Sequence, residues 1–291
     1  MNNRVNTEKI ATRFSKAAPH YDRIASLQRE VGNRLFQRLE LIRIKPQVIL
    51  DLGCGTGHFT RRLTKRYSNA QVIAIDIAQG MLQQVRKKGW LWSKPHAVQA
   101  HMAQLPFPSQ SVDLIFSNFV IHWHDDCTQL FQELRRVLKP NGLFMFTTVG
   151  PDTLKELRQA WQTVDDYVHV NTFTDMHDLG DAVLQAQFSD PVMEMEYFCL
   201  TYKNAMDLMH ELKALGASYI HAARNPHLMG KNRLQQCVLA YEQFRNAQGK
   251  LPATYEIVYG HAFVPAMSNR AHANAQGEVS IPLSAIKRQH G

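Results

Sequence analysis

The sequence predicts an α/β protein built around a doubly wound, mostly parallel β-sheet. Between residues 47 and 149, short apolar runs typical of buried strands alternate with segments of helical periodicity. A glycine-rich turn at 53–57 joins the first of these runs to the helical segment that follows it. Strands that alternate with helices pair in parallel, with helices on both faces and a ligand crevice at the carboxyl ends of the strands.

Each element of this pattern has its own signal. A helical segment at 7–42 precedes the sheet, because Leu27, Val31, Leu35 and Leu39 recur at helical spacing. Strands are expected at 47–52, 71–77, 96–102, 112–120 and 142–149. Helices between them are expected at 58–67, 78–89 and 127–138, and the turn Lys139-Pro140-Asn141-Gly142 closes the last of these.

Beyond Gly150 the pattern becomes mainly helical. Helices are expected at 151–161, 176–188 and 205–216, and a late strand at 253–264 is expected to return to the sheet. The expected divisions of the chain are an N-terminal helical lid at 1–45, a ligand-binding core at 46–150, a helical cap or substrate region at 151–266 and a C-terminal tail at 267–291.

Composition excludes several classes of protein. The 291 residues are 45% hydrophobic, enough to bury a sizeable core, and they contain neither a signal-peptide pattern nor a long apolar run. The four cysteines form no C-x-x-C pair, so reduced thiols and a cytoplasmic location are expected. The net charge of +8 suits an acidic partner, although short basic runs can also be solvated helix faces. No nucleic-acid-binding signature and no membrane segment accompany this charge.

The stretch ILDLGCGTGHF at 49–59 decides what kind of ligand the crevice holds. A P-loop would need Lys and then Ser or Thr where His58 and Phe59 stand. The glycines at 53, 55 and 57 also have the wrong spacing for a dinucleotide fingerprint. Asp51 would repel a pyrophosphate but attract an ammonium or sulfonium cation. The sequence therefore favours a cationic amino-acid cofactor.

Asp76 ends the second strand, 25 residues after Asp51. This offset is close to the roughly 20 residues at which a carboxylate binds the ribose hydroxyls in nucleotide-binding βαβ units. A helix N-cap before the AQGML segment is the alternative. Because the two acidic residues end consecutive strands and flank one crevice, ribose binding is favoured.

The motifs LDLGCGTG, DIAQGML, QLPFPSQSVDLIFSN and LRRVLKPNGLFMF resemble, in order and spacing, those of class I S-adenosylmethionine-dependent methyltransferases. The resemblance covers 48–149 and implies a seven-stranded Rossmann-like sheet with S-adenosyl-L-methionine as cofactor. It places the methionine moiety near Asp51 and Gly53, the ribose on Asp76, adenine against Met81, and the methyl donor opposite Asn118. The implied cofactor-binding residues are Asp51, Gly53, Gly55, Gly57, Asp76, Ile77, Met81, His101, Met102 and Asn118.

The resemblance extends over nearly the whole chain. Three further segments are similar to segments of the biotin-pathway malonyl-acyl-carrier-protein O-methyltransferase family: RFSKAAPHYDRIASLQREVG, ARNPHLMG and PATYEIVYGHAF. That family esterifies the free carboxyl of a malonyl thioester, so malonyl-acyl carrier protein is the implied substrate and partner. LPATYEIVYGHA and HDLG also resemble complex I assembly methyltransferase-like proteins, which act on a protein arginine. A scaffold that binds the cofactor weakly is a third alternative, because His101 replaces an acidic residue common in the family.

Methylation of a carboxylate needs positioning more than proton transfer, since the carboxylate is already a nucleophile. Arg224 matches an arginine of the family and would grip the malonyl carboxylate, unless it forms only a surface salt bridge. Tyr21 would close over the methyl group and hydrogen-bond the substrate carbonyl, or simply pack the lid. His122, which stands where the family often has Gln, is the candidate substrate-pocket donor.

Two further features of the sequence have structural alternatives. HWHDD, at 122–126, gathers potential metal ligands, but neighbouring side chains of a loop diverge and no metal site is expected. Trp123 is expected to form a wall of the substrate pocket or part of the core. Trp161 and Phe173 line either an acyl channel or the core.

Overall fold

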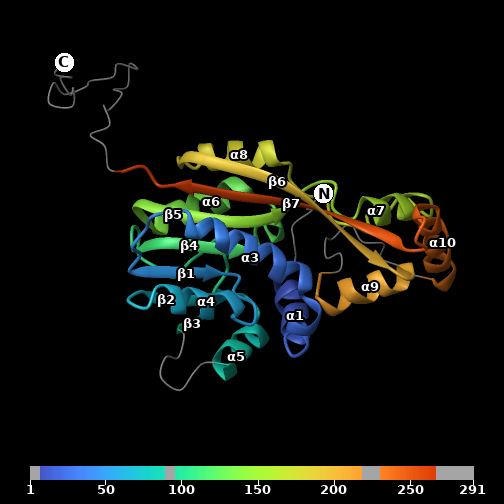
Figure 1. Cartoon of the computed structure of the whole chain (residues 1–291), viewed down its shortest axis with the longest axis horizontal. Coiled ribbons are helices and arrows are strands. Elements are labelled where there is room, and N and C mark those ends of the chain that lie inside the picture. Colours follow the sequence, from blue (N-terminus) through green and yellow to red (C-terminus); the bar gives the residue numbers. More distant parts are fainter. Residues whose placement is uncertain (1–6, 89–95, 218–229, 267–291) are drawn as a thin grey trace, which may run out of the picture.

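The computed structural model describes residues 7–88, 96–217 and 230–266, and within these ranges it contains a seven-stranded sheet of order β3-β2-β1-β4-β5-β7-β6 (Figure 1). Every strand pair from β3 to β5 is parallel, whereas β7 runs antiparallel to both of its neighbours. The strands are β1 (Val48–Leu52), β2 (Gln71–Asp76), β3 (His96–Gln99), β4 (Val112–Asn118), β5 (Leu138–Val149), β6 (Ser189–Tyr202) and β7 (Leu251–Phe263). The predicted fold class is confirmed.

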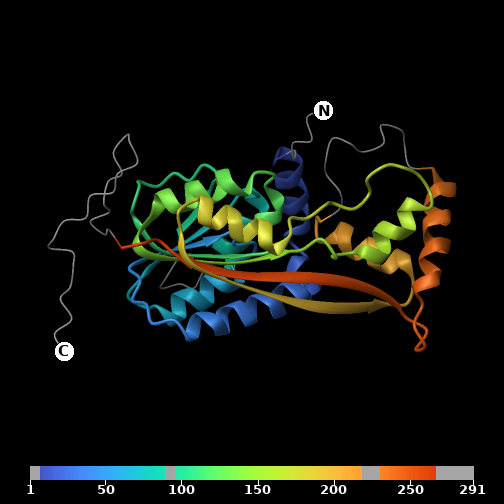
Figure 2. The same ribbon diagram turned by 90° about the horizontal axis from the view of Figure 1, so that it is seen from above.

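Helices cover both faces of the sheet (Figure 2). They are α1 (Thr7–Ala17), α2 (Tyr21–Ile24), α3 (Ser26–Glu40), α4 (His58–Arg66), α5 (Gln79–Lys88), α6 (Cys127–Val137), α7 (Lys155–Gln162), α8 (Met176–Gln185), α9 (Ala205–Ala214) and α10 (Lys231–Tyr241). Short 3₁₀ turns lie at η1 (Ile121–Trp123) and η2 (Glu242–Phe244). No helix among the described residues is both long and apolar enough to cross a bilayer.

Alternation along the strands sends successive side chains to opposite faces. On β1, Ile49 packs in the core beneath α3 and α4, whereas Leu50 packs with α6 on the other face. Both residues are fully buried, as expected for central strands of a parallel sheet. The sheet is therefore covered on both sides, and its carboxyl-end edge remains for a site.

The N-terminal segment does not form one uniform lid. In α3, Val31, Leu35 and Leu39 are buried against the sheet, so this helix belongs to the core. Only α1 and α2 lie at the carboxyl ends of the strands. The proposed lid is therefore restricted to residues 7–24 of the described chain.

The structure differs from the prediction in the C-terminal half, where β6 and α10 had not been expected. β6 is a 14-residue edge strand that pairs along β7, and the two extend beyond the rest of the sheet toward α7, α9 and α10 (Figure 1). β6 is an edge strand whose half-buried residues alternate with exposed ones, so it lacks the long buried run that marks the central strands. The predicted turn at 139–142 lies inside β5, where Asn141 takes a positive φ and the register with β4 shifts.

Candidate active site

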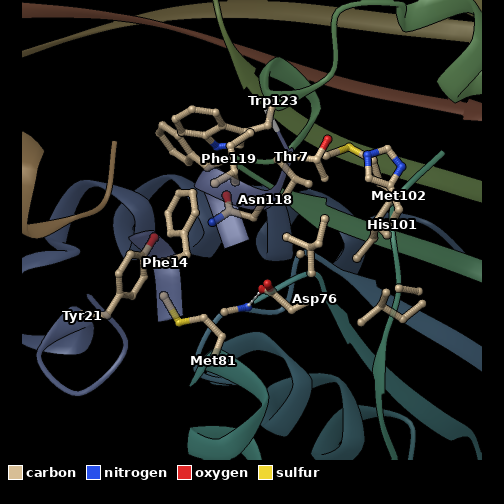
Figure 3. Close-up of a pocket in the computed structure, with 18 residues that line it drawn as sticks. Thr7, Phe14, Tyr21, Asp76, Met81, His101, Met102, Asn118, Phe119 and Trp123 are labelled. Atoms are coloured by element: carbon tan, nitrogen blue, oxygen red, sulfur yellow. Dashed lines mark hydrogen bonds between the residues drawn. The ribbon is translucent and has the colours of Figure 1, made fainter. Parts of the chain in front are cut away.

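One cavity lies at the carboxyl ends of β1, β2 and β4, beneath α1 and α2 (Figure 3). Most of the side chains that line it are apolar, and Asp76 is the one carboxylate among its described lining residues. Asp76 lies between His101 and Met102 on one side and Phe14 and Tyr21 on the other. Of the residues predicted from sequence, the cavity is lined by Tyr21, Gly53, Gly55, Asp76, Ile77, Met81, His101, Met102 and Asn118.

The glycine loop forms one wall of the cavity. Gly53 and Gly55 have φ values of 68° and 53°, which glycine adopts without a steric penalty. A Cβ atom on Gly53 would lie 2.0 Å from Val120 Cγ2, so the loop can approach the segment between β4 and η1 only without a side chain. Gly57 does not line the cavity. It turns the chain into α4 with a φ of 79° and packs against Val85 of α5.

The Asp76 carboxylate fixes the loop and faces the cavity. Its Oδ2 accepts a hydrogen bond of 3.0 Å from the amide of Gly55, and its Oδ1 accepts one of 2.8 Å from the amide of Ala78. The second bond lies at the start of α5, so the alternative capping role is observed. Burial raises the pKa of Asp76 to about 6. Capping leaves lone pairs on both oxygens that can accept ribose hydroxyls.

Asp51 does not line the cavity, contrary to the prediction of direct cofactor contact. Alternation along β1 turns its side chain toward α4, where Oδ2 accepts a 2.5 Å hydrogen bond from Thr60 Oγ1. The residue is 2% exposed, and burial, together with the nearby Asp76 charge, raises its pKa to about 7. Asp51 therefore lies outside the lining of the cavity, where Thr60 holds its carboxylate.

The end of the cavity assigned to adenine is mainly apolar. Met81 is 1% exposed, and Ile77 and Met102 line the same cavity. Burial lowers the pKa of His101, so the ring is neutral at pH 7, and its Nδ1 accepts a 3.2 Å bond from the amide of Ala103. The proton is then on Nε2, which makes the ring a donor on its remaining nitrogen. The contact with Ala103 thus occupies one of the two ring nitrogens of His101.

α1 and α2 close the opposite end. Phe14 of α1 meets Trp123 edge-to-face, with ring centroids 5.4 Å apart. Burial and the charges of Asp76 and Asp22 raise the pKa of Tyr21, which keeps the phenol protonated as a donor. Thr56 Oγ1 donates a 2.5 Å hydrogen bond to Asp22 Oδ1 and so ties α2 to the glycine loop.

Asn118 lines the cavity, but protein partners hold its amide. Its Oδ1 accepts a 2.8 Å hydrogen bond from Thr147 Oγ1, and its Nδ2 donates a 3.0 Å bond to the carbonyl of Gln28. These contacts connect β4, β5 and α3. Asn118 is therefore a rigid wall opposite the glycine loop.

His122 does not line the cavity that Tyr21 lines. Its ring packs among Phe119, Trp123 and Phe173, and it borders a second cavity on the far side of η1. Burial lowers its pKa to about 3, so it is a neutral imidazole. Arg224 lies outside the described residues.

The remaining aromatic candidates, Trp123, Trp161 and Phe173, lie in three different parts of the structure. Trp123 lines the same cavity as Asp76, and Phe173 borders the second cavity beside His122. Trp161 instead stacks on His169 with centroids 3.9 Å apart, inside the helical region. Among the described residues, no group of three potential ligands is arranged to hold a metal ion.

Comparison with known proteins gives the family. A family model described as a methyltransferase domain matches residues 50–146. A malonyl-[acyl-carrier protein] O-methyltransferase of Methylovorus is 47% identical over 90% of this chain and 90% of its own length. The enzyme of the same name from Legionella pneumophila is 44% identical over 98% and 99%. The chain belongs to the malonyl-[acyl-carrier protein] O-methyltransferase family.

Solved structures give the same fold at low identity. The YcgJ protein of Bacillus subtilis aligns with a TM-score of 0.57 and 17% identity, covering 80% of this chain and 98% of its own. A Haloferax volcanii methyltransferase in complex with its Trm112 activator aligns at 0.52 and 15%, covering 87% and 97%. Membership of this methyltransferase family confirms the predicted enzyme class, with S-adenosyl-L-methionine as cofactor.

The cavity fits the cofactor of this family. A carboxylate stands at the end of β2, apolar side chains stand beside it, and the glycine loop leaves room on the third side. Sequence reasoning missed Ile10 and Phe14, which line the cavity from α1. Their helical spacing in the N-terminal segment was a usable signal, since Ile10 and Phe14 share one face of α1.

Replacing Gly80 with alanine is expected to weaken cofactor binding several-fold without lowering the melting temperature. A Cβ atom there would lie 2.4 Å from the Ser15 carbonyl oxygen, so α1 would have to move off α5. Alanine meanwhile favours the helix by up to about 1 kcal/mol. Calorimetric titration with S-adenosylhomocysteine and thermal melting measure the two effects.

Gly180→Ala in α8 is the matched control for that substitution, because nothing lies within 4 Å of a Cβ atom at Gly180. It should gain the same helical preference and leave the affinity unchanged. Equal affinities for Gly80→Ala and Gly180→Ala would show that α1 does not close the cofactor site.

Cofactor affinity is expected to fall as the pH drops below about 6. The pKa of Asp76 is raised to about 6, so the carboxylate gains a proton as the pH falls through that value and loses acceptor strength. At pH 5 about nine-tenths of the sites would be protonated, which predicts a roughly tenfold loss relative to pH 7.5. Titration of S-adenosylhomocysteine between pH 5 and 8 measures this.

The Asp76→Asn variant separates the effect of Asp76 from that of Asp51. Its weaker affinity should stay flat from pH 5 to 6.5, because no proton can be gained at residue 76. A wild-type affinity that does not change across this range would contradict the role given to Asp76.

Proposed function

We propose that the protein transfers the methyl group of S-adenosyl-L-methionine to the free carboxylate of malonyl-acyl carrier protein. The near full-length similarity to enzymes of that name carries the proposal. The geometry of the cavity supports it. Asp76 and the apolar residues beside it suit the adenosine, and the end near Tyr21, Phe14 and Trp123 is left for the reacting groups.

Among the described residues that line the reacting end of the cavity, none is suited to act as a general base. The pKa of Tyr21 is raised, so its phenol stays protonated. The amide of Asn118 is hydrogen-bonded within the protein, and the other neighbouring side chains are Phe14, Phe119 and Trp123. A hydroxyl or amine acceptor would need a base, whereas a carboxylate is ionised at pH 7. The lining therefore favours a carboxylate acceptor.

When bound, S-adenosyl-L-methionine supplies an electrophilic methyl group on a sulfonium. A carboxylate oxygen of the acceptor forms the new C–O bond as the C–S bond breaks, and its electron pair stays on sulfur. The charges of carboxylate and sulfonium cancel, so a dry site favours the transition state over the separated ions. Phe14 and Trp123 exclude water, and Tyr21 donates a hydrogen bond to the acceptor.

Arg224 and His122 complete the proposal. Arg224, in the stretch ARNPHLMG, is proposed to hold the malonyl group through its guanidinium fork. His122 is proposed as a neutral donor on the substrate side of η1, since burial keeps its ring uncharged.

The proposed setting is the cytoplasm, with malonyl-acyl carrier protein as partner and no nucleic acid. All four cysteines, Cys54, Cys127, Cys199 and Cys237, are free thiols, which suits a reducing compartment. The net charge of +8 suits an acidic protein partner.

Mass spectrometry of malonyl-acyl carrier protein, after incubation with the protein and S-adenosyl-L-methionine, tests the proposal. The expected result is a gain of one methyl group, and acetyl-acyl carrier protein, which lacks the free carboxylate, should gain nothing. Arg224→Ala should raise the KM for the malonyl substrate. No gain at saturating cofactor, or equal gain on both substrates, would refute the proposal.

A further inference from the structure

A set of basic side chains lies immediately outside the cavity wall. Arg61 and Lys65 are exposed on α4, and His58 lies on the same helix face. Arg23 of α2 is also exposed. We call these four residues, Arg23, His58, Arg61 and Lys65, the basic face. In the described part of the chain, no carboxylate forms an ion pair with any of them, whereas Arg66 pairs with Glu40.

Thr56 connects this face to the cavity. Its hydroxyl donates to Asp22 Oδ1 at 2.5 Å, and its carbonyl accepts a 3.3 Å hydrogen bond from Arg61 Nη1. Gly55, on one side of Thr56, lines the cavity, as does Tyr21, which precedes Asp22. A molecule bound on the basic face would therefore stand against the wall that holds the reacting end.

The potential on this face is positive. Burial lowers the pKa of His58, and the charges of Arg61, Arg62 and Arg29 lower it further, with only Asp22 opposing them. Arg29 itself donates to the Asp22 carbonyl, which holds α3 at the same place. His58 and Arg61 lie in the first turn of α4, where the helix dipole adds to the positive potential, whereas Lys65 lies in its last turn.

We propose that the basic face is the docking surface for the acidic carrier protein that bears the malonyl group. The inference rests on the proposed function. A carboxylate carried on a protein requires that protein to stand beside the cavity, and charge complementarity selects an acidic surface. Arg23, Arg61 and Lys65 are exposed cations with no acidic ion-pair partner among the described residues, and they lie close to Tyr21, which fits that requirement.

The double variant Arg61→Glu/Lys65→Glu tests this role. Its matched control is Arg43→Glu/Lys45→Glu, which changes the charge equally at two exposed residues before the amino end of β1, at the opposite edge of the sheet. Three quantities are compared. They are methylation of malonyl-acyl carrier protein, methylation of the small thioester malonyl-N-acetylcysteamine, whose thiol part is uncharged, and carrier binding by fluorescence anisotropy.

The α4 variant is expected to lose about tenfold in kcat/KM for the carrier substrate, through a higher KM and with less dependence on salt. Activity on the small thioester and affinity for S-adenosylhomocysteine should fall much less, because Arg61 contacts the cavity wall only through its 3.3 Å hydrogen bond to the Thr56 carbonyl. The control should stay within about twofold on all three measurements.

Three results would overturn the docking proposal. These are unchanged carrier kinetics in the α4 variant, an equal loss in the control, and an equal loss on the small thioester. If the wild type methylates neither acceptor, the proposed function fails instead. In that case, carrier binding measured by fluorescence anisotropy decides the docking role on its own. Unchanged carrier binding in the α4 variant refutes the docking role, even if the basic face binds an RNA duplex.

Discussion

Replacing Asp76 with alanine is expected to lower the affinity for S-adenosylhomocysteine by at least about 100-fold. The side chain would bind the two ribose hydroxyls, and hydrogen bonds to a charged group are worth about 1.5–3 kcal/mol each. Its loss also releases the amides of Gly55 and Ala78, which shape the cavity wall. Isothermal titration calorimetry measures the affinity, and Asp76→Asn should give an intermediate loss.

Asp175→Ala separates cofactor binding from helix capping. Asp175 Oδ1 accepts a 2.7 Å hydrogen bond from the amide of His177 at the start of α8, the same two-residue pattern that Asp76 forms with Ala78. The control should lose about 1 kcal/mol of stability and keep its cofactor affinity. If Asp76→Ala behaves in the same way, Asp76 is only a structural cap.

Gly53→Ala is expected to destabilise the protein by about 2–4 kcal/mol and to abolish measurable cofactor binding. The φ of 68° is strained for alanine, and the new Cβ atom would lie 2.0 Å from Val120 Cγ2. Relief requires the loop to move away from β4, which changes the shape of the cavity. Urea unfolding and calorimetric titration measure the two losses.

Gly249→Ala isolates the contribution of backbone strain. Gly249 has a φ of 69°, nearly that of Gly53, but nothing lies within 4 Å of a Cβ atom placed there. Its stability should fall by only about 1–2 kcal/mol, with unchanged affinity. Equal losses in the two variants would mean that the contact with Val120 is unimportant.

The central sheet and the cofactor end of the cavity were predictable because their signals are local. Buried strands are visible as apolar runs, and the glycines mark the turn between the first strand and the helix after it. Asp76 was recognisable from its place at the end of β2 and its distance from Asp51. The family resemblance added Met81, His101 and Asn118, which all line the cavity.

Features that depend on tertiary packing were not predictable from local patterns. Asp51 lies on a strand whose last residues face either the cavity or α4, and the sequence does not show which. The division between α1 over the cavity and α3 in the core appears only when both helices are packed. β6 is an edge strand defined by its pairing with β7, so its own residues carry a weak signal.

The most direct test of the central claim is a crystal structure of the protein with S-adenosylhomocysteine. We predict the ligand between the glycine loop and α1, both ribose hydroxyls within hydrogen-bond distance of Asp76, adenine beside Met81, and sulfur facing Tyr21. A ligand bound elsewhere, or one whose ribose makes no contact with Asp76, would contradict this account of the site.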